Sequence, residues 1–212
     1  MLKRVPLLGV ALGLAGLMLL TNGGWIWAKA QLAQLLLQRS WSAMQQQGRE
    51  LKPWPWADTH ALARLRLPAL GVDQLVLDGD SGRTLAFGPG LNSNSGLPGS
   101  SRLTLISGHR DTHFRFLSRI ESGMEIEVET LQGRWRYRIE ARQVINIDEG
   151  AVSVSDNRPG LLLVTCYPFD TLEPGGPLRL LVWAEPAEQA LAHTNDPALS
   201  APQPQGLDPV RI

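Results

Sequence analysis

The chain of 212 residues contains one cysteine, Cys166, and equal numbers of basic and acidic residues. A single cysteine excludes an internal disulfide and zinc sites of the Cys-x-x-Cys type. A formal net charge of zero gives no reason to expect a nucleic acid or another polyanionic partner. Tyrosine is scarce, with two residues, whereas the chain contains seven tryptophans. Five of the tryptophans (Trp25, Trp27, Trp41, Trp54 and Trp56) precede residue 61, a bias that favours a membrane surface.

The N-terminal segment is typical of a membrane anchor. Lys3 and Arg4 precede an apolar stretch from Val5 to Ala28, which as a helix would be about 36 Å long, enough to cross a bilayer core of about 30 Å. The basic pair favours a cytoplasmic N-terminus, and Trp25 and Trp27 suit the far interface. We therefore expect residues 1–30 to be an uncleaved signal anchor. The competing hypothesis is a cleavable signal peptide, because Ala28-Lys29-Ala30 has the small-x-small form of a cleavage site.

Residues 31–60 are expected to be a stalk and a linker. Leu32, Leu35, Leu36, Trp41 and Met44 lie near helical spacing, which predicts a helix leaving the membrane. The segment Lys-Pro-Trp-Pro-Trp at 52–56 breaks that helix and is expected to run extended. Its tryptophans would dock on the membrane face or on the folded domain. The second alternative, in which the rings cover exposed core, is favoured.

From residue 61 the sequence predicts short strands separated by turns. The expected strands are Ala63–Leu67, Gln74–Asp78, Arg102–Ser107, Met124–Thr130, Arg134–Ala141, Leu161–Cys166 and Pro177–Ala184. Those at 124–130 and 134–141 alternate clearly on either side of a short turn and predict a hairpin. A short helical turn is expected after residue 109. Such a pattern indicates an all-β barrel or sandwich over residues 61–185, and residues 186–212 are expected to form a disordered tail.

Cys166 ends an apolar strand, where a side chain is held rigidly and can still meet a substrate. The structural alternative is a small buried hydrophobe, the usual fate of a free cysteine. A catalytic thiol needs a base, and of the four histidines His60 and His193 lie in the linker and the tail. His109 ends another predicted strand, so neighbouring strands would present it beside Cys166; alternatively it is a solvated or capping residue.

Arg179 lies on the last predicted strand between two leucines. A guanidinium there is costly to bury without a partner and well suited to hold a developing oxyanion. Alternation equally permits an arginine that points outward.

Together these features resemble the sortases, membrane-anchored bacterial cysteine transpeptidases. The resemblance covers about residues 63–185 and rests on Leu-Arg-Leu-Pro-Ala-Leu-Gly-Val-Asp, Leu-Pro-Gly-Ser, Gly-His-Arg-Asp-Thr, Thr-Cys-Tyr-Pro-Phe-Asp and a final strand arginine. The family's Thr-Leu-x-Thr-Cys signature reads Leu-Leu-Val-Thr-Cys here, and we expect Leu162 to alter packing more than chemistry. The Gly-His-Arg-Asp-Thr form is similar to that of the small sortases of Gram-negative bacteria.

The resemblance implies a closed β-barrel of about seven or eight strands behind a transmembrane helix. It implies a single-pass protein of the bacterial inner (plasma) membrane, with the barrel on the periplasmic side. The activity implied is cleavage of an LPXTG-like C-terminal sorting signal through a Cys166 thioester and transfer of the acyl group to an amine at the cell envelope. His109 would be the acid and base, Arg179 the oxyanion or substrate-positioning residue, and Thr165 would shape the substrate pocket.

Several alternatives stay open at this stage. Asp111 would orient the imidazole or contact substrate, or it would cap the following turn, which is favoured. A metal site from His109, Asp111, His113 and Cys166 is disfavoured by the ligand spacing, and neither a metal nor a cofactor is expected. The competing functions are a cysteine peptidase that hydrolyses the same signal and a non-catalytic barrel that binds peptides.

Overall fold

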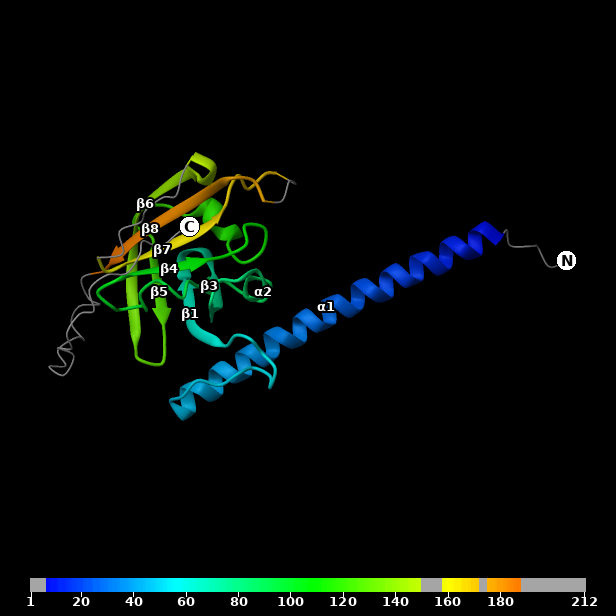
Figure 1. The fold of residues 1–212 in the computed structure, drawn as a ribbon, viewed down its shortest axis with the longest axis horizontal. Helices are drawn as coiled ribbons and strands as arrows, with labels where there is room; N and C mark the ends of the chain where they lie inside the picture. The colour runs from blue at the N-terminus through cyan, green and yellow to red at the C-terminus, as the bar shows by residue number, and fades with distance from the viewer. Residues whose placement is uncertain (1–6, 150–157, 172–174, 188–212) are drawn as a thin grey trace.

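The computed structural model describes residues 7–149, 158–171 and 175–187, and within them eight strands close into a barrel (Figure 1). The neighbouring strands around the barrel are β1-β2-β3-β4-β7-β8-β6-β5, and β5 pairs back to β1. The strands are β1 (Ala61–Leu67), β2 (Val72–Asp78), β3 (Gly90–Leu91), β4 (Leu103–Ser107), β5 (Glu125–Glu129), β6 (Arg134–Asn146), β7 (Gly160–Cys166) and β8 (Leu178–Pro186). The short helices are η1 (Pro68–Leu70), α2 (Gly82–Leu85), η2 (Arg115–Arg119) and η3 (Ile147–Glu149). The expected closed barrel is confirmed.

Alternating side chains build the wall formed by β1 and the β5–β6 hairpin. Along β1 every second residue is buried, so that Leu65 and Leu67 enter the core while Arg64 and Arg66 stay on the outer face. There, Arg64 Nε lies 2.6 Å from Asp73 Oδ1 of β2, and Arg66 Nη1 lies 2.9 Å from Glu127 Oε1 of β5. The predicted hairpin is confirmed, with Glu125 opposite Arg138 and Glu129 opposite Arg134.

A parallel and an antiparallel pairing hold β7 at the centre of the opposite wall. β7 runs parallel to β4, with Ser107 opposite Val164, and antiparallel to β8, with Cys166 opposite Arg179. Both faces of β7 are covered: Leu161 and Leu163 face the barrel core, and Leu162 and Val164 belong to an outer apolar cluster. Burial on both faces explains the uninterrupted aliphatic run before Cys166.

One helix, α1 (Leu7–Gln47), contains both the predicted anchor and the predicted stalk (Figure 1). It is long and apolar enough to cross a membrane. Its last third packs against the barrel, where Leu37, Trp41 and Met44 form a buried cluster with residues of β1 and β2 such as Leu75 and Leu77. The helix therefore continues from the apolar segment into the folded domain without a break.

The structure departs from the sequence-based expectations in three places. Strand β6 extends to Asn146, five residues beyond its predicted end, because it stays paired to β8 through Asn146 and Leu178 after a register shift near residue 140. The two-residue strand β3 and the single turn of α2 lie in a stretch predicted to be a loop. The 52–56 linker contains bends and a turn, and the tail predicted for residues 186–212 lies outside the described residues beyond Ala187.

Candidate active site

The pairing of β7 with β8 brings Cys166 and Arg179 together at one end of the barrel. The two residues are direct partners in an antiparallel ladder, so their side chains share a face and their Cβ atoms lie about 5 Å apart. Alternation from Leu162 and Val164 puts this pair on the outer face of the wall. Both side chains are partly exposed, and Cys166 is a free thiol. The Cys166 thiol and the Arg179 guanidinium therefore belong to one partly exposed face at this end of the barrel.

His109 follows β4 at the level of Cys166. The ladder between β4 and β7 continues past Ser107, because Gly108 N donates to Val164 O at 3.1 Å. Thr165 Oγ1 donates to Gly108 O at 2.7 Å, which ties the residue before Cys166 to the residue before His109. A Cβ at position 108 would meet the Phe114 ring at 2.6 Å, so only glycine fits this crossing. These contacts fix the backbone on which the exposed His109 side chain stands.

Thr165 was expected to contact substrate, and the structure gives it a different environment. Its side chain is 2% exposed and its hydroxyl is bonded to a backbone carbonyl. This geometry favours a role in positioning the two strand ends.

Backbone carbonyls hold the Arg179 side chain. Its Nη1 donates to Gly176 O at 2.5 Å and to Leu178 O at 2.9 Å. Within the described residues both hydrogen bonds of this guanidinium start from Nη1. These carbonyl oxygens carry no net charge, so they do not neutralise the positive charge of the Arg179 guanidinium.

Arg110 is a site residue that the sequence analysis did not single out. Its side chain is 5% exposed and crosses to the loop after Cys166, where Nη1 donates to Pro168 O at 2.7 Å and Nη2 to Thr171 O at 3.4 Å. That loop begins with a cis peptide between Tyr167 and Pro168. Arg110 thus joins the chain after His109 to the chain after Cys166. The sequence shows an arginine next to His109, but its partners lie 58 and 61 residues away.

The Asp111 carboxylate faces its neighbour, since Arg110 Nε donates to Asp111 Oδ1 at 3.1 Å. The turn that follows, η2, has Phe114 at its N-cap position and no side-chain cap among the described residues, so Asp111 does not have the favoured role of capping it. His113 lies near His109: burial, with a smaller contribution from the His109 charge, lowers the pKa of His113. Burial therefore favours the neutral form of the His113 imidazole.

No group of three or more metal-ligating side chains occurs in the described ranges.

Behind Ser107, a polar cluster supports the end of β4. Asp80 Oδ2 accepts from Ser107 Oγ at 3.1 Å and from Asn92 Nδ2 at 3.0 Å. Asp80 belongs to the connection between β2 and β3, so this connection is joined to the strand that presents His109.

A cavity of about 490 Å³ lies beside the loop that follows Cys166. Its walls come from η2, from β6 and from the loop itself, and they are formed by Leu117, Ser118, Arg142, Gln143, Val144, Tyr167, Pro168, Phe169, Asp170 and Leu180. Tyr167 and Phe169 contact each other edge to face with ring centroids 6.2 Å apart. The cavity is large enough for one or two amino-acid side chains, and its lining includes the four residues that directly follow Cys166.

Leu162, the departure from the family signature, is fully buried in the outer apolar cluster with Leu103, Leu105, Val164 and Leu181. It lies four residues before Cys166, about 13 Å along the strand. The leucine at this position therefore contributes to the packing of this wall.

Comparison with known proteins agrees with this geometry. Sortase D of Bacillus subtilis (strain 168) is 25% identical over 122 residues, which are 57% of this chain and 61% of that protein. The chain thus spans less than two thirds of that relative's length. A Clostridium perfringens sortase D5 transpeptidase superposes with a TM-score of 0.58 at 19% identity, over 74% of this chain and 99% of that one. Sortase A from Corynebacterium diphtheriae gives 0.55 at 24% identity, over 68% and 67%.

These structural likenesses establish the barrel as sortase-like. The model of the Sortase domain family matches residues 65–187, which is more than half of the chain and includes His109, Cys166 and Arg179. The chain belongs to the sortase family.

Proposed function

We propose that this chain is a membrane-anchored cysteine transpeptidase. It would cleave an LPXTG-like sorting signal near the C-terminus of a substrate protein and transfer the acyl group to an amine at the cell envelope. The observation that carries the proposal is the placement of three residues at one barrel end: Cys166 at the end of β7, Arg179 opposite it on β8, and His109 two residues beyond the end of the neighbouring strand β4.

In the first half-reaction, Cys166 Sγ attacks the carbonyl carbon of the Thr-Gly bond, and His109 takes up the thiol proton. The carbonyl oxygen becomes an oxyanion, which Arg179 stabilises through Nε and Nη2, because only Nη1 donates to backbone carbonyls among the described residues. The C–N bond then breaks, His109 returns the proton to the departing amine, and a thioester remains on Cys166.

In the second half-reaction an amine attacks the thioester carbonyl and gives its proton to His109. Arg179 again stabilises the oxyanion, the C–S bond breaks, and the departing thiolate takes the proton from His109 to restore the thiol. Water in place of the amine would give a free acid, so hydrolysis and transfer share every step up to the acyl-enzyme.

Supporting roles follow from the contacts. Thr165 and Arg110 would act as positioning residues, because each bonds to backbone next to His109 or Cys166. The cavity beside Tyr167 and Phe169 would take part in the choice of substrate. The α1 helix would hold the barrel on the outer side of the bacterial inner membrane, as in the small sortases of Gram-negative bacteria.

The test is to incubate the full-length protein in detergent with LPXTG-type peptides and an oligoglycine amine, and to identify the products by mass. The expected result is a peptide joined to the amine and, in the absence of amine, a thioester on Cys166. Cys166→Ala should form neither product and keep the fold, and Arg179→Ala should lose about 10²- to 10³-fold in rate. A free acid as the sole product would make the protein a peptidase. No product with a reactive thiol would favour a binding barrel.

A further inference from the structure

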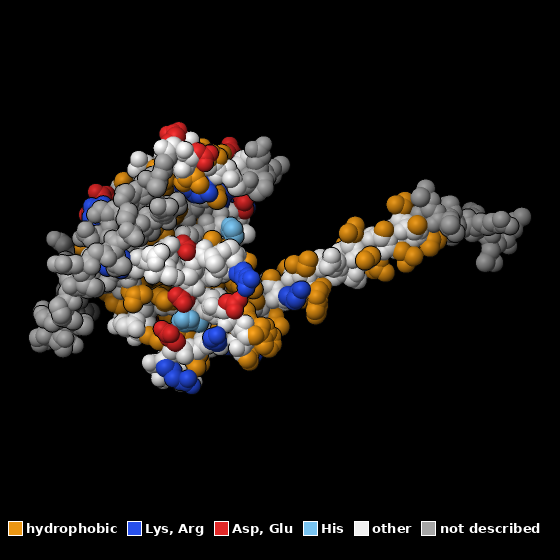
Figure 2. All heavy atoms as spheres, viewed as in Figure 1, with side chains coloured by type: hydrophobic (Ala, Val, Ile, Leu, Met, Phe, Trp, Pro, Cys, Tyr) orange, Lys and Arg blue, Asp and Glu red, His pale blue; other side chains and the backbone are white. Residues whose placement is uncertain are grey.

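Part of the barrel lies close to the end of the apolar segment of α1. The helix surface is exposed up to Leu32, and contact with the barrel begins at Ala33, which is buried. From Trp27, at the end of the apolar stretch, to Ala33 is six residues, or about 9 Å of helix. Figure 2 shows apolar side chains along α1 up to its junction with the barrel.

This short distance matters for a helix that crosses a bilayer. The headgroup layer on each side of the hydrocarbon core is about 5–8 Å deep. A core boundary at Trp27 therefore puts the first docked turn of α1 within or just beyond the headgroups. Leu32 and Leu35 are about half exposed at this level, which suits a partly apolar surrounding.

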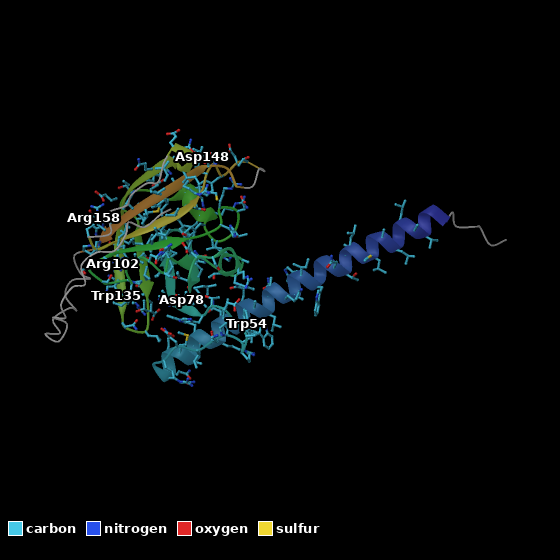
Figure 3. All side chains as sticks on the ribbon, viewed as in Figure 1. Trp54, Asp78, Arg102, Trp135, Asp148 and Arg158 are labelled. Carbon is cyan, nitrogen blue, oxygen red and sulfur yellow. The ribbon has the colours of Figure 1, made fainter. Side chains whose placement is uncertain are left out.

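The linker turn lies at the same level of the helix. Ala57 N donates to Trp54 O at 3.0 Å and closes the turn. The Trp54 ring contacts Phe87 edge to face at 5.6 Å, and Phe87 O accepts from Gln34 Nε2 of α1 at 2.6 Å. Figure 3 labels Trp54 beside α1, where the helix meets the barrel.

Trp56, in this turn, is 80% exposed, the largest exposed fraction among the described large apolar side chains. From the sequence, the tryptophan rings of the linker are expected to cover exposed core. Trp54 does so through Phe87, while Trp56 points its ring into solvent. An exposed indole next to the end of a transmembrane helix matches the preference of tryptophan for the membrane interface.

The same side of the barrel leads to the active site. The connection between β2 and β3 contains both Phe87, which contacts α1 through Gln34, and Asp80, which accepts from Ser107. Ser107 is two residues before His109. One short segment of chain therefore links the helix junction to the strand end that presents the imidazole.

From these contacts we propose that the turn around Trp56 is a second membrane contact, seated in the lipid headgroup layer, and that it holds the active-site end of the barrel at the bilayer surface. The partner is the bilayer itself. This inference rests on the crossing of the membrane by α1, which belongs to the proposed function, and it requires no catalytic turnover for its test.

The experiment uses the full-length chain in phosphatidylcholine vesicles that contain a headgroup spin-labelled lipid. In a Cys166→Ala background, single cysteines at Ala86, Arg158 and Leu14 receive an environment-sensitive fluorophore. Ala86 is exposed next to Phe87, and Arg158 lies on the side of the barrel away from the junction (Figure 3). Leu14 is 63% exposed on the apolar part of α1 and reports whether the helix inserts.

The expected result is headgroup quenching at Ala86 at least threefold stronger than at Arg158, with blue-shifted emission at Ala86. Equal quenching at Ala86 and Arg158, with Leu14 protected from an aqueous quencher, would overturn the second contact and leave the anchor intact. An accessible Leu14 would contradict membrane insertion, and with it both the inference and the anchoring.

A paired variant tests the role of the indole. Trp56→Ser, combined with the Ala86 probe, should reduce headgroup quenching at Ala86 by at least half, and Trp54→Phe, which keeps an aromatic ring against Phe87, should leave it unchanged. Unchanged quenching in Trp56→Ser would show that Trp56 makes no contact with the membrane. A probe on the native Cys166 should give quenching between those at Ala86 and Arg158.

Discussion

The arginines on two sides of the barrel have different hydrogen-bond partners. On the side formed by β1, β2 and β5, each described arginine of β1 meets carboxylates, as Arg64 meets Asp73 and Arg66 meets Glu127. At the active-site end, backbone carbonyls hold Arg179, whereas Arg110 has both carbonyl partners and the Asp111 carboxylate. A carboxylate neutralises an arginine, whereas a carbonyl only orients it. The first arrangement supports the wall, and the second keeps a positive charge ready for a substrate.

The apolar surfaces of the two sides differ in the same way. Outside β1 and β2, the cluster of Leu75 and Leu77 is covered by α1. Outside β4, β7 and β8, the cluster around Leu162 leads along the strand to the partly exposed Cys166. The outer face of β1 and β2 thus attaches the barrel to α1, and the outer face of β4, β7 and β8 ends at the Cys166 thiol.

The largest expected effect is on the active-site side. His109→Ala should lower kcat/KM by about 10³- to 10⁴-fold, because both half-reactions need a proton carrier. The unfolding midpoint should stay near that of the wild type, since the His109 side chain is exposed. The matched control is His113→Gln, which removes the neighbouring imidazole. Transfer rates and urea unfolding check the two quantities, and a His109→Ala enzyme with near-normal turnover would contradict the assignment.

On the attachment side, Trp41→Ala should destabilise the protein by about 3–5 kcal/mol and leave the chemistry of the folded molecule unchanged. Trp41 is 1% exposed between α1 and the barrel, so its removal opens a cavity at the junction. Urea unfolding of the full chain in detergent measures the effect. Gln38→Ala, exposed on the same helix, is the control and should be neutral. Equal midpoints for both variants would mean that α1 adds nothing to the stability of the barrel.

Arg110 lies between these extremes, because it is buried like a structural residue and belongs to the active-site end. Arg110→Ala should lower kcat/KM by roughly 10- to 100-fold, the equivalent of losing a charged hydrogen bond to the loop after Cys166. Arg110→Lys should recover part of the loss, and Arg115→Ala, an exposed arginine nearby, should have little effect.

A second measurement separates positioning by Arg110 from simple damage. The rate at which iodoacetamide alkylates Cys166 should be unchanged in Arg110→Ala, because the thiol itself is held by β7. The preference among peptides varied within the sorting signal should change, because the loop that Arg110 holds forms part of the cavity wall. A fall in alkylation equal to the fall in kcat/KM would refute the positioning role.

Local patterns were enough to predict much of the fold. Alternation in β1 and in the β5–β6 hairpin, and the aliphatic run of β7, set the strands that the structure contains. Cys166 and His109 were both expected at strand ends, and in the structure Cys166 ends β7 while His109 lies two residues beyond β4. The features that were not predicted depend on strands that are distant in the sequence. The extension of β6 to Asn146 requires pairing with β8, and the two residues of β3 are held between β2 and β4.

Side-chain roles were harder to predict for the same reason. Thr165 looks like a pocket residue in the sequence, and only the packing of β4 against β7 shows that its hydroxyl reaches Gly108. The carbonyl partners of Arg110 lie in a loop almost sixty residues away. A sequence shows which residues can carry charge, and the fold decides whether a carboxylate, a carbonyl or a substrate meets it.

The smallest expected effect concerns the ion pairs of the attachment side. A hydrogen bond from Arg64 lowers the pKa of Asp73 below its usual value of 3.8. A lowered folded pKa stabilises the protein above the unfolded pKa, and this contribution disappears as the pH falls through the folded value. Because the Asp73 side chain is 44% exposed, solvent screens the pair to below about 1 kcal/mol.

Asp73→Asn should therefore lower the free energy of unfolding slightly at pH 7, and the difference from the wild type should shrink as the pH falls through the lowered pKa of the folded state, because the aspartate then becomes protonated in both states. Urea unfolding over a series of decreasing pH values measures this, with 0.5 M salt as a second way to weaken the pair. A difference that persists unchanged through the acid series and in salt would mean that Asp73 acts through packing. In that case, the contrast between carboxylate-paired and carbonyl-held arginines would rest on the active-site end alone.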